Sequence, residues 1–358
     1  MNIVRFQGEA PTIYYEFDKD SAPLGEGGMG RVYQGFRVDT RLNLQYVVAI
    51  KCIKPELAAN PVVIQRAQRE ASVQLDHSNL IRMYGFFSGA EFNQYTGTYI
   101  PTYYIAMERL LGVNLDEILF KGVVSDRSGM VIPLAQELKD SYDQDKVRAS
   151  LGMMLPILSG VEHLHNCGFV HRDLDPSNVM ITQEGNVKLI DFGICKRLGI
   201  TNVGNSGLTQ AGQFLGKVAY AAPELILGDV NSQGPATDIY ALGIILFQLA
   251  MGYLPVEGTD QQVMDAHLKG NLNLSAVTDK RLRKIIEKAT AKDPNKRYVS
   301  AREFSSDISA MLEGSTMSYH PASSSSEAKK EVNVPNSIIP ICSAAGLIVG
   351  IILSFIIR

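Results

Sequence analysis

One stretch of this sequence is more informative about the fold than any other: His171-Arg172-Asp173-Leu174-Asp175-Pro176-Ser177-Asn178, with Asp191-Phe192-Gly193 a short way further along the chain. Asp173 provides a carboxylate that can orient a hydroxyl nucleophile. Asn178 and Asp191 provide an amide and a second carboxylate that can hold Mg²⁺, because magnesium prefers hard oxygen ligands and keeps water and phosphate oxygens in its shell. The alternative, two acidic turns with structural helix caps, is disfavoured by two motifs that precede this stretch.

Both of those motifs suit the phosphates of a nucleotide. The run Leu24-Gly25-Glu26-Gly27-Gly28-Met29-Gly30-Arg31-Val32 fits GxGxxG followed by valine, and glycine lets the backbone approach phosphate because it has no Cβ. Strand-like residues rather than a helix follow this run, which argues against a dinucleotide-binding fold. The second motif, Val48-Ala49-Ile50-Lys51, is an apolar strand that ends in a lysine. Glu70, on a predicted helix, is a candidate partner for the lysine ammonium.

The composition is that of a globular protein with more than one compact unit. The chain has 358 residues, a net charge of −3 and 46% hydrophobic residues, whereas an ordinary domain has about 150 residues. So small a charge gives no basic field for nucleic acid, and we expect no nucleic-acid partner. Four dispersed cysteines form no CxxC pair, which argues against a disulfide-stapled secreted fold and against a zinc site.

The hydrophobic pattern changes along the chain. Short apolar runs and Gly-rich turns up to about residue 108 precede helical periodicity, so a strand-rich half comes before a helix-rich half. Ile239–Met251 is apolar nearly all round, as in a helix buried at the centre of a lobe. We expect four parts, namely an N-terminal extension at 1–12, a folded domain at 13–312, a flexible polar linker at 313–337 and a transmembrane helix at 338–357.

Taken together, these motifs resemble the eukaryotic-like (Hanks-type) protein kinases over residues 13–312. Three further motifs follow in the family's order, Ala222-Pro223-Glu224, Asp238–Gly243 and Lys296-Arg297-Tyr298. The glycine-rich run and the closing motif are most similar to bacterial Ser/Thr kinases. The resemblance implies an α+β, bilobal fold, with a small strand-rich N-lobe that contains one helix, a larger helical C-lobe, and ATP in the cleft between them.

The resemblance also implies a role for each matched residue. Asp173 would orient or accept the proton of a substrate hydroxyl, Lys51 would bind the α- and β-phosphates, and Glu70 would hold that lysine. Asn178 and Asp191 would hold Mg²⁺. The glycine-rich loop, adenine pocket, gatekeeper and hinge would contact ATP through Leu24, Gly25, Glu26, Gly27, Gly28, Gly30, Val32, Ala49, Met107, Glu108, Leu110 and Met180.

Other matched residues would support the fold rather than the chemistry. Glu224 and Arg297 are expected to form a buried ion pair. Asp238, at the start of the buried helix, is expected to accept hydrogen bonds from backbone amides of the catalytic loop.

Two positions depart from the family's pattern. The family's lysine two residues after the catalytic aspartate is Asp175 here, and the threonine before Ala222-Pro223-Glu224 is Lys217. We predict a relocated cation, in which Lys217 pairs with Asp175 and presents its ammonium near the γ-phosphate, so that Lys217 joins Lys51 and Asp173 as a catalytic residue. Two unrelated losses in a decaying kinase are the alternative. Two segments, 88–102 and 122–146, are longer than usual, and their sequence indicates no role.

The C-terminal segment predicts a membrane anchor. Residues 338–357 carry no charge and, as a helix, would span about 30 Å, the hydrocarbon thickness of a bilayer. A buried core helix is the alternative, disfavoured because the segment follows a polar linker. ATP is cytosolic and Lys329 and Lys330 precede the helix, so we expect the kinase domain on the cytoplasmic side, with no extracellular sensor domain and no signal peptide. Small residues at four-residue spacing make a homodimer a candidate, namely Cys342, Gly346, Gly350 and Ser354.

The sequence therefore predicts a single-pass membrane Ser/Thr protein kinase that uses ATP and Mg²⁺ and acts on protein substrates. Arg172, before the catalytic aspartate, indicates control by phosphorylation of the loop 194–221, with Thr209 as a candidate site. A nucleotide-binding pseudokinase that acts as a scaffold is the first alternative, because of Asp175. A small-molecule kinase is the second, disfavoured by Ala222-Pro223-Glu224.

Overall fold

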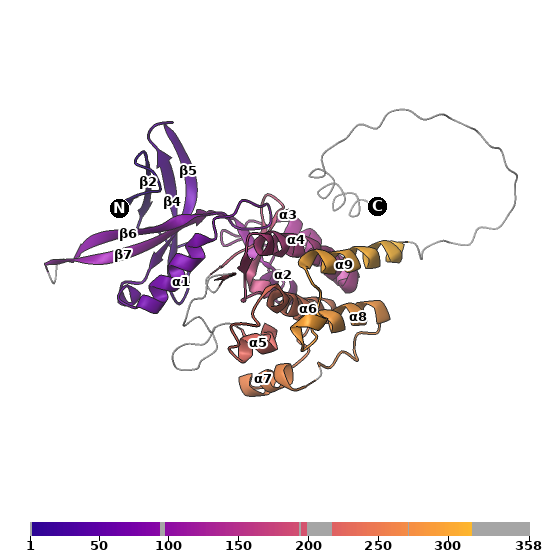
Figure 1. Ribbon diagram of the computed structural model, residues 1–358. Coiled ribbons are helices and arrows are strands. Elements are labelled where there is room, and N and C mark those ends of the chain that lie inside the picture. Colours follow the sequence, from indigo (N-terminus) through magenta and orange to yellow (C-terminus); the bar gives the residue numbers. More distant parts are fainter. Residues whose placement is uncertain (1, 94–96, 193–194, 199–216, 271, 317–358) are drawn as a thin grey trace, which may run out of the picture. The chain divides into compact units, whose positions relative to one another are not determined.

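The computed structural model describes residues 2–93, 97–192, 195–198, 217–270 and 272–316. Within that part, a strand-rich N-lobe precedes a helix-rich C-lobe (Figure 1), so the predicted α+β bilobal fold is confirmed. None of the helices in these residues is long and apolar enough to cross a membrane. The predicted transmembrane segment 338–357, and all of the predicted linker beyond Thr316, lie outside the described residues.

The N-lobe is built on one antiparallel sheet of seven strands in the order β1-β2-β4-β5-β7-β6, with the short β3 paired to β4. Its strands are β1 (Ile3–Gln7), β2 (Ile13–Asp18), β3 (Gly25–Glu26), β4 (Gly30–Asp39), β5 (Leu44–Ile53), β6 (Met83–Asn93) and β7 (Thr98–Glu108). Strand β1 comes from the predicted N-terminal extension, and it pairs with β2 along its whole length. The extension is thus part of the sheet.

Aromatic side chains explain why β1 joins the sheet. In β2, Ile13, Tyr15 and Phe17 are buried and alternate with half-buried neighbours, as the two-residue period of a strand requires. Phe6 of β1 stacks on Tyr104 with ring centroids 4.4 Å apart and on Tyr15 at 5.5 Å. This aromatic face forms the core of the sheet, and the opposite face is left for α1 and the cleft.

Helix α1 (Pro61–Ser72) begins at a clear capping signal. The Asn60 side chain accepts a hydrogen bond from Val62 N, and proline stands at the first helical position, both of which favour a helix start. The 3-10 turn η1 (Pro55–Leu57) leads into it. Helix α1 packs against β6 and β7, and it buries Ala67, Glu70 and Ala71. Glu70 is thereby turned inward.

The C-lobe surrounds α6 (Pro235–Met251), which is buried almost throughout, as its apolar sequence predicts. The other helices are α2 (Leu115–Lys121), α3 (Pro133–Gln144), α4 (Lys146–Asn166), α5 (Pro223–Ile226), α7 (Asp260–Leu268), α8 (Lys280–Ala289) and α9 (Ala301–Thr316). The short strands β8 (Gly112–Asn114), β10 (Val179–Thr182) and β11 (Val187–Leu189) form one sheet, and β9 (Phe169–Val170) pairs with β12 (Lys196–Arg197). The 3-10 turns are η2 (Pro176–Asn178), η3 (Val218–Tyr220) and η4 (Pro294–Lys296).

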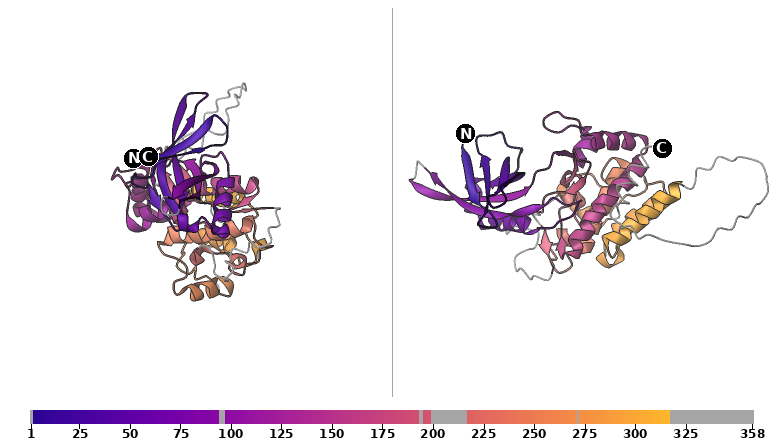
Figure 2. Two further views of the ribbon diagram at one scale, coloured as in Figure 1. Left: turned by 90° about the vertical axis from the view of Figure 1, so that its left-hand side faces the viewer. Right: turned by 90° about the horizontal axis from the view of Figure 1, so that it is seen from above.

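The two long segments add structure at the edges of the lobes. Residues 88–93 and 98–102 prolong the paired strands β6 and β7, which extend beyond the rest of the N-lobe sheet (Figure 2). Residues 122–146 form a turn around Asp126 and then α3. The lobes are joined near the cleft, where Ile81 N donates to Leu189 O at 2.9 Å.

Candidate active site

Lys51 of β5 and Glu70 of α1 form a buried ion pair. The Lys51 Nζ lies 2.8 Å from each Glu70 carboxylate oxygen, and the two side chains are 16% and 4% exposed. Burial lowers the pKa of the Lys51 ammonium, but the negative charges of Glu70 and Asp191 outweigh it, so the pKa stands above its ordinary value. The ammonium therefore stays charged, held by one carboxylate and facing another.

Three further predicted nucleotide residues share the sheet face of Lys51. Val32 stands opposite Lys51 in the strand register, and Ala49 stands opposite Met107. Paired residues point to the same face, and the face alternates with every residue. Val32, Ala49 and Met107 therefore line the side of the sheet that carries the lysine, while the aromatic core occupies the other side.

The glycine-rich run forms the tight connection between β3 and β4. Gly27 N donates to Gly30 O at 2.9 Å. A Cβ on Gly30 would lie 2.3 Å from the carbonyl oxygen of Cys52, whereas the spaces beside Gly27 and Gly28 are open. Gly30 is thus required by packing, whereas the open space beside Gly27 and Gly28 leaves room for the close approach of a phosphate.

Four predicted site residues lie at the edges of this arrangement. Leu24 and Glu26 flank the glycine loop, where Leu24 N donates to Val32 O at 2.7 Å. Leu110 lies in the connection between β7 and β8, and Met180 lies on β10 of the C-lobe. The assignments of Leu110 to the hinge and of Met180 to the adenine pocket stay predictions.

The catalytic loop is held by a buried carboxylate of α6. Asp238 accepts hydrogen bonds from the backbone N–H groups of His171 and Arg172 at 2.8 Å each, and its Oδ2 lies 2.7 Å from His165 Nε2. Asp238 is 0% exposed. Burial raises the pKa of the Asp238 carboxyl, but the hydrogen bond from His165 and nearby histidine charge outweigh it, so the pKa is lowered. The expected contact of Asp238 with the loop amides is confirmed.

Two residues of the site have backbone in the left-handed region. Arg172 has φ 67° and Asp191 has φ 65°. Side chains other than glycine rarely adopt this conformation, and it costs about 1–3 kcal/mol where it persists. The strain falls on the residue before Asp173 and on a predicted Mg²⁺ ligand, and the hydrogen bond from Arg172 N to Asp238 helps to hold the first of them.

Asn178 and Asp191 are suited to the oxygen-rich shell of Mg²⁺. Asn178 Nδ2 donates to the backbone carbonyl of Asp173 at 2.8 Å, which leaves the amide oxygen as the atom that can bind metal. Burial raises the pKa of the Asp173 carboxyl, and the charges of Asp191 and Asp175 raise it further, against the charge of His171. Carboxylates that repel one another in this way favour a divalent cation among them.

The described side chains offer few ligands for a metal ion. Among the residues that the structure describes, no group of three or more His, Cys, Asp and Glu side chains could hold a metal. Magnesium is ordinarily bound by one or two carboxylates together with substrate phosphates and water. The donor set fits a metal that arrives with a nucleotide.

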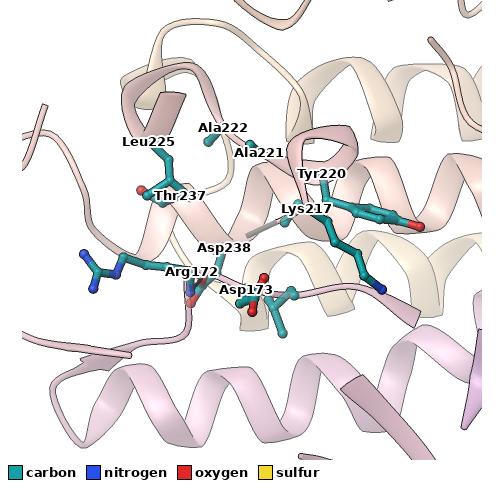
Figure 3. Close-up of a pocket in the computed structure, with 11 residues that line it drawn as sticks. Arg172, Asp173, Lys217, Tyr220, Ala221, Ala222, Leu225, Thr237 and Asp238 are labelled. Atoms are coloured by element: carbon teal, nitrogen blue, oxygen red, sulfur yellow. Dashed lines mark hydrogen bonds between the residues drawn. The ribbon is translucent and has the colours of Figure 1, made fainter. Parts of the chain in front are cut away.

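A small pocket opens beside Asp173 (Figure 3). It is lined by residues of the catalytic loop, η3, α5 and α6, namely Arg172, Asp173, Leu174, Lys217, Tyr220, Ala221, Ala222, Leu225, Thr237, Asp238 and Ala241. Lys217 Nζ donates to Asp175 Oδ1 at 2.7 Å, so the structure brings together the two residues that depart from the family's pattern.

The sequence did not point to several residues around this site. Arg127, in the turn after α2, donates through Nη1 to the carbonyl oxygen of Leu24 at the glycine loop. Gln233 accepts a hydrogen bond from Arg172 Nη1 at 3.0 Å through its side chain, and one from Lys196 Nζ at 3.2 Å through its backbone. Arg127 and Gln233 belong to no motif, and only the folded chain brings them to the site.

The family-level comparison agrees with this geometry. The model of the protein kinase domain family matches residues 19–307, so this chain belongs to the protein kinase domain family. The relatives it resembles are bacterial serine/threonine kinases, which confirms the predicted Hanks-type Ser/Thr family.

Three of those relatives show the extent of the likeness. The probable serine/threonine-protein kinase PknB of Lactococcus lactis subsp. lactis is 33% identical over 293 residues, and the serine/threonine-protein kinase PrkC of Bacillus subtilis is 32% identical over 295 residues. Each alignment covers 80% of this chain, but only 40% and 39% of the two relatives. The serine/threonine-protein kinase PknA of Mycobacterium tuberculosis is 30% identical over 295 residues, which are 81% of this chain and 60% of the relative.

Proposed function

We propose that this chain is an active Ser/Thr protein kinase that transfers the γ-phosphoryl group of ATP to hydroxyl groups of proteins. The observation that carries the proposal is that the Lys51 ammonium, paired with Glu70, and the Asp173 carboxyl both lie within the electrostatic reach of Asp191. The backbone carbonyl of Asp173 also accepts a hydrogen bond from Asn178. Asp173 also lines a small pocket beside the catalytic loop, and a protein that only held a nucleotide would have no need of a carboxylate there.

Each residue would act by position and charge. Lys51, fixed by Glu70, would orient the α- and β-phosphates, and Asp173 would orient the substrate hydroxyl and take its proton. Asn178 and Asp191 would hold Mg²⁺, which when bound neutralises charge on the phosphate oxygens. Catalysis of this kind depends on positioning and electrostatic stabilisation more than on covalent chemistry by the protein.

The test is a radiolabelled-ATP assay with a generic protein substrate, followed by phosphosite mapping. Asp173→Asn should lower kcat by about 10²–10⁴-fold, the usual range for a positioned acid–base group, while nucleotide binding persists. Turnover that is the same in Asp173→Asn and in wild-type protein would remove Asp173 from the mechanism. Nucleotide binding by a wild-type protein that phosphorylates nothing would favour the pseudokinase.

We further propose that the kinase phosphorylates its own loop. Arg172 and Lys196 both contact Gln233, so two cations from the catalytic loop and β12 gather at one place. Burial lowers the pKa of Arg172, and the positive charge of Arg69 on α1 lowers it further. A phosphate of roughly −2 charge would relieve this repulsion and bind there. Thr209, the candidate site, lies outside the described residues.

Mass spectrometry of the purified kinase tests that idea. Phosphate on the loop 194–221 is expected in wild-type protein and should be absent from Asp173→Asn prepared in the same way. An active enzyme whose loop carries no phosphate would contradict self-phosphorylation.

Membrane attachment through residues 338–357 is the third part of the proposal, with the kinase domain on the cytoplasmic side. Its support is the uncharged sequence of that segment and the two lysines that precede it. The full chain should sediment with membranes and remain there in high salt, whereas a chain ending at residue 316 should not. Gly346→Ile with Gly350→Ile should weaken self-association if the small residues form a dimer face.

A further inference from the structure

The ammonium of Lys217 is fixed to the catalytic loop by two hydrogen bonds. Its Nζ donates to Asp175 Oδ1 at 2.7 Å and to Ser177 Oγ at 2.8 Å. The Asp175 side chain is 2% exposed and the Lys217 side chain is 52% exposed. The carboxylate therefore lies inside the loop, while the lysine that neutralises it stays accessible and lines the same pocket as Asp173.

Asp175 ties this ammonium to the predicted magnesium ligand. One Asp175 oxygen accepts from Ser177 N at 2.7 Å and from Ser177 Oγ at 2.6 Å, and Asn178 Nδ2 lies 3.4 Å from the other oxygen. Asp175 thus caps the three-residue turn η2, which runs from Pro176 to Asn178. The geometry of one short turn sets the place of the cation relative to the metal-binding amide.

The backbone that carries Lys217 is anchored as well. Lys217 directly precedes η3, and Tyr220 N donates to Lys217 O at 3.1 Å. The buried Tyr220 donates its hydroxyl to Gln248 Oε1 of α6 at 2.7 Å. Because the backbones on both sides of the ion pair are held, the ammonium is in place before any ligand binds. Charge that is already in place stabilises a transition state without a cost of reorganisation.

A second cation lines the pocket, but it is turned elsewhere. Arg172 Nη1 donates to Gln233 Oε1 at 3.0 Å, and in Figure 3 Arg172 and Lys217 extend in opposite directions. Asp173, Asp175 and Asp191 give this part of the cleft negative charge, and a γ-phosphate would add more. Lys217, bonded to the turn that leads to Asn178, is therefore the lining cation best placed to meet that phosphate.

We propose that Lys217 stabilises the phosphoryl group during its transfer, from the segment before Ala222-Pro223-Glu224 rather than from the catalytic loop. The inference rests on the proposed kinase function. In the step, the substrate oxygen bonds to the γ-phosphorus and the bond to the β–γ bridging oxygen breaks. The electron pair of that bond leaves with ADP, and the hydroxyl proton passes to Asp173. Lys217 offsets charge on the phosphoryl oxygens and takes no part in the covalent change.

Three variants separate this role from simple charge balance. Lys217→Met removes the cation. Lys217→Met combined with Asp175→Asn removes both charges, so no buried carboxylate is stranded. We expect kcat to fall about 10²–10³-fold in both, the range seen when one preorganised donor is lost. The control is Lys269→Met, which removes a lysine that is paired with Asp265 at 3.2 Å and 78% exposed, and which should behave as wild type.

Two readouts decide what Lys217 does. Hydrolysis of ATP with water as acceptor should fall by a similar factor, and the KM for a protein substrate should stay near its wild-type value. A raised KM with unchanged ATP hydrolysis would assign Lys217 to substrate binding and overturn the proposal. Full activity in the doubly substituted variant would also overturn it, because the function of Lys217 would then be limited to neutralising the Asp175 carboxylate.

The reciprocal exchange is the positive test. Asp175→Lys with Lys217→Thr returns a lysine to the loop and should keep kcat within about tenfold of wild type, equivalent to about 1.4 kcal/mol. Wild-type protein without any kinase activity would refute the proposed function itself. Wild-type activity that Asp173→Asn abolishes and the Lys217 variants retain would refute only the role of Lys217.

Discussion

Charged side chains are buried in two regions of this protein kinase domain, the interior of the C-lobe and the candidate active-site cleft, and their charges are balanced differently in each. In the C-lobe, the Arg297 guanidinium contacts the two Glu224 oxygens at 2.7 and 2.9 Å. Three backbone carbonyls accept its other hydrogen bonds, and the two side chains are 0% and 5% exposed. The expected pair is confirmed, and its two charges neutralise each other within the protein.

In the cleft, the protein's own groups do not fully neutralise the buried charges, and a ligand can complete the neutralisation. The Lys51 ammonium is paired with Glu70 and also feels the charge of Asp191, and the pKa of Asp173 is raised by burial and by neighbouring carboxylates. Such an arrangement costs stability, and it is typical of a site that awaits cations and phosphate. Substitutions that break the buried C-lobe pair should therefore lower stability, whereas removing the Asp173 carboxylate from the cleft should lower turnover and leave stability equal or higher.

The largest stability effect is expected for Arg297→Met. Removing the guanidinium strands the buried Glu224 carboxylate, although the hydrogen bond from Thr237 Oγ1 at 2.9 Å would remain. Loss of one partner of a buried pair costs about 3–5 kcal/mol. Urea unfolding should show this loss, while kcat of the fraction that remains folded should change little.

Arg302→Met is the matched control for that experiment. Arg302 pairs with Glu162 at 3.2 Å, but its side chain is 77% exposed, and exposed pairs contribute about 0–1 kcal/mol. Equal destabilisation by the two substitutions would contradict the view that burial makes the Arg297–Glu224 pair more important for stability than an exposed pair.

A pH effect of intermediate size is expected from His267. Its ring is 0% exposed, and Nδ1 lies 2.8 Å from the Tyr240 hydroxyl. Burial, together with the positive charge of Lys292, lowers the pKa of His267 from 6.5 to about 4. The pKa of His267 is lower in the folded than in the unfolded state, so folding favours the neutral ring. The contribution of His267 to stability is therefore complete above pH 6.5. It is lost as the pH falls toward 4, by up to about 3 kcal/mol.

His267→Gln isolates that contribution. The variant keeps a polar group near Tyr240 but does not titrate, so its free energy of unfolding should fall less steeply than that of wild type between pH 6.5 and about 4. Parallel pH profiles for the two proteins would show that His267 is not the titrating group.

The fold and the main site residues could be predicted from the sequence because they belong to contiguous motifs. Lys51 and Asp173 stand in runs whose residue order is itself informative, and Asp238 and Arg297 follow in the same order. Contacts between single polar residues could not be predicted in this way. Ser177 as a second acceptor for Lys217 depends on how the turn η2 meets η3, which no local pattern encodes.

Strand β1 illustrates the same limit for the fold. In Ile3–Gln7, Val4 and Phe6 alternate with Arg5 and Gln7, but only Phe6 is buried and Val4 is half-buried, so the segment takes its place from its partners more than from its own short pattern. Phe6 is fixed by stacking on Tyr104, nearly a hundred residues away along the chain. The Arg127 contact with Leu24 is likewise non-local, with a sequence separation of 103 residues.

The smallest stability effect in this series, and the one with opposite sign, is expected for Asp173→Asn. The folded pKa of Asp173 is raised, so at neutral pH, where its carboxyl is charged in the unfolded chain, the folded state bears the cost of burying that charge beside Asp175 and Asp191. The amide removes this cost and should stabilise the ligand-free protein by up to about 1 kcal/mol, as active-site substitutions that sacrifice activity often do. Because wild-type Asp173 becomes protonated in both states as the pH falls, the gain should shrink toward low pH. Urea unfolding of both proteins at neutral and acidic pH measures it. A variant that is inactive and also less stable than wild type at neutral pH would mean that the charge of Asp173 supports the fold, and the contrast between cleft and C-lobe would then fail at its central residue.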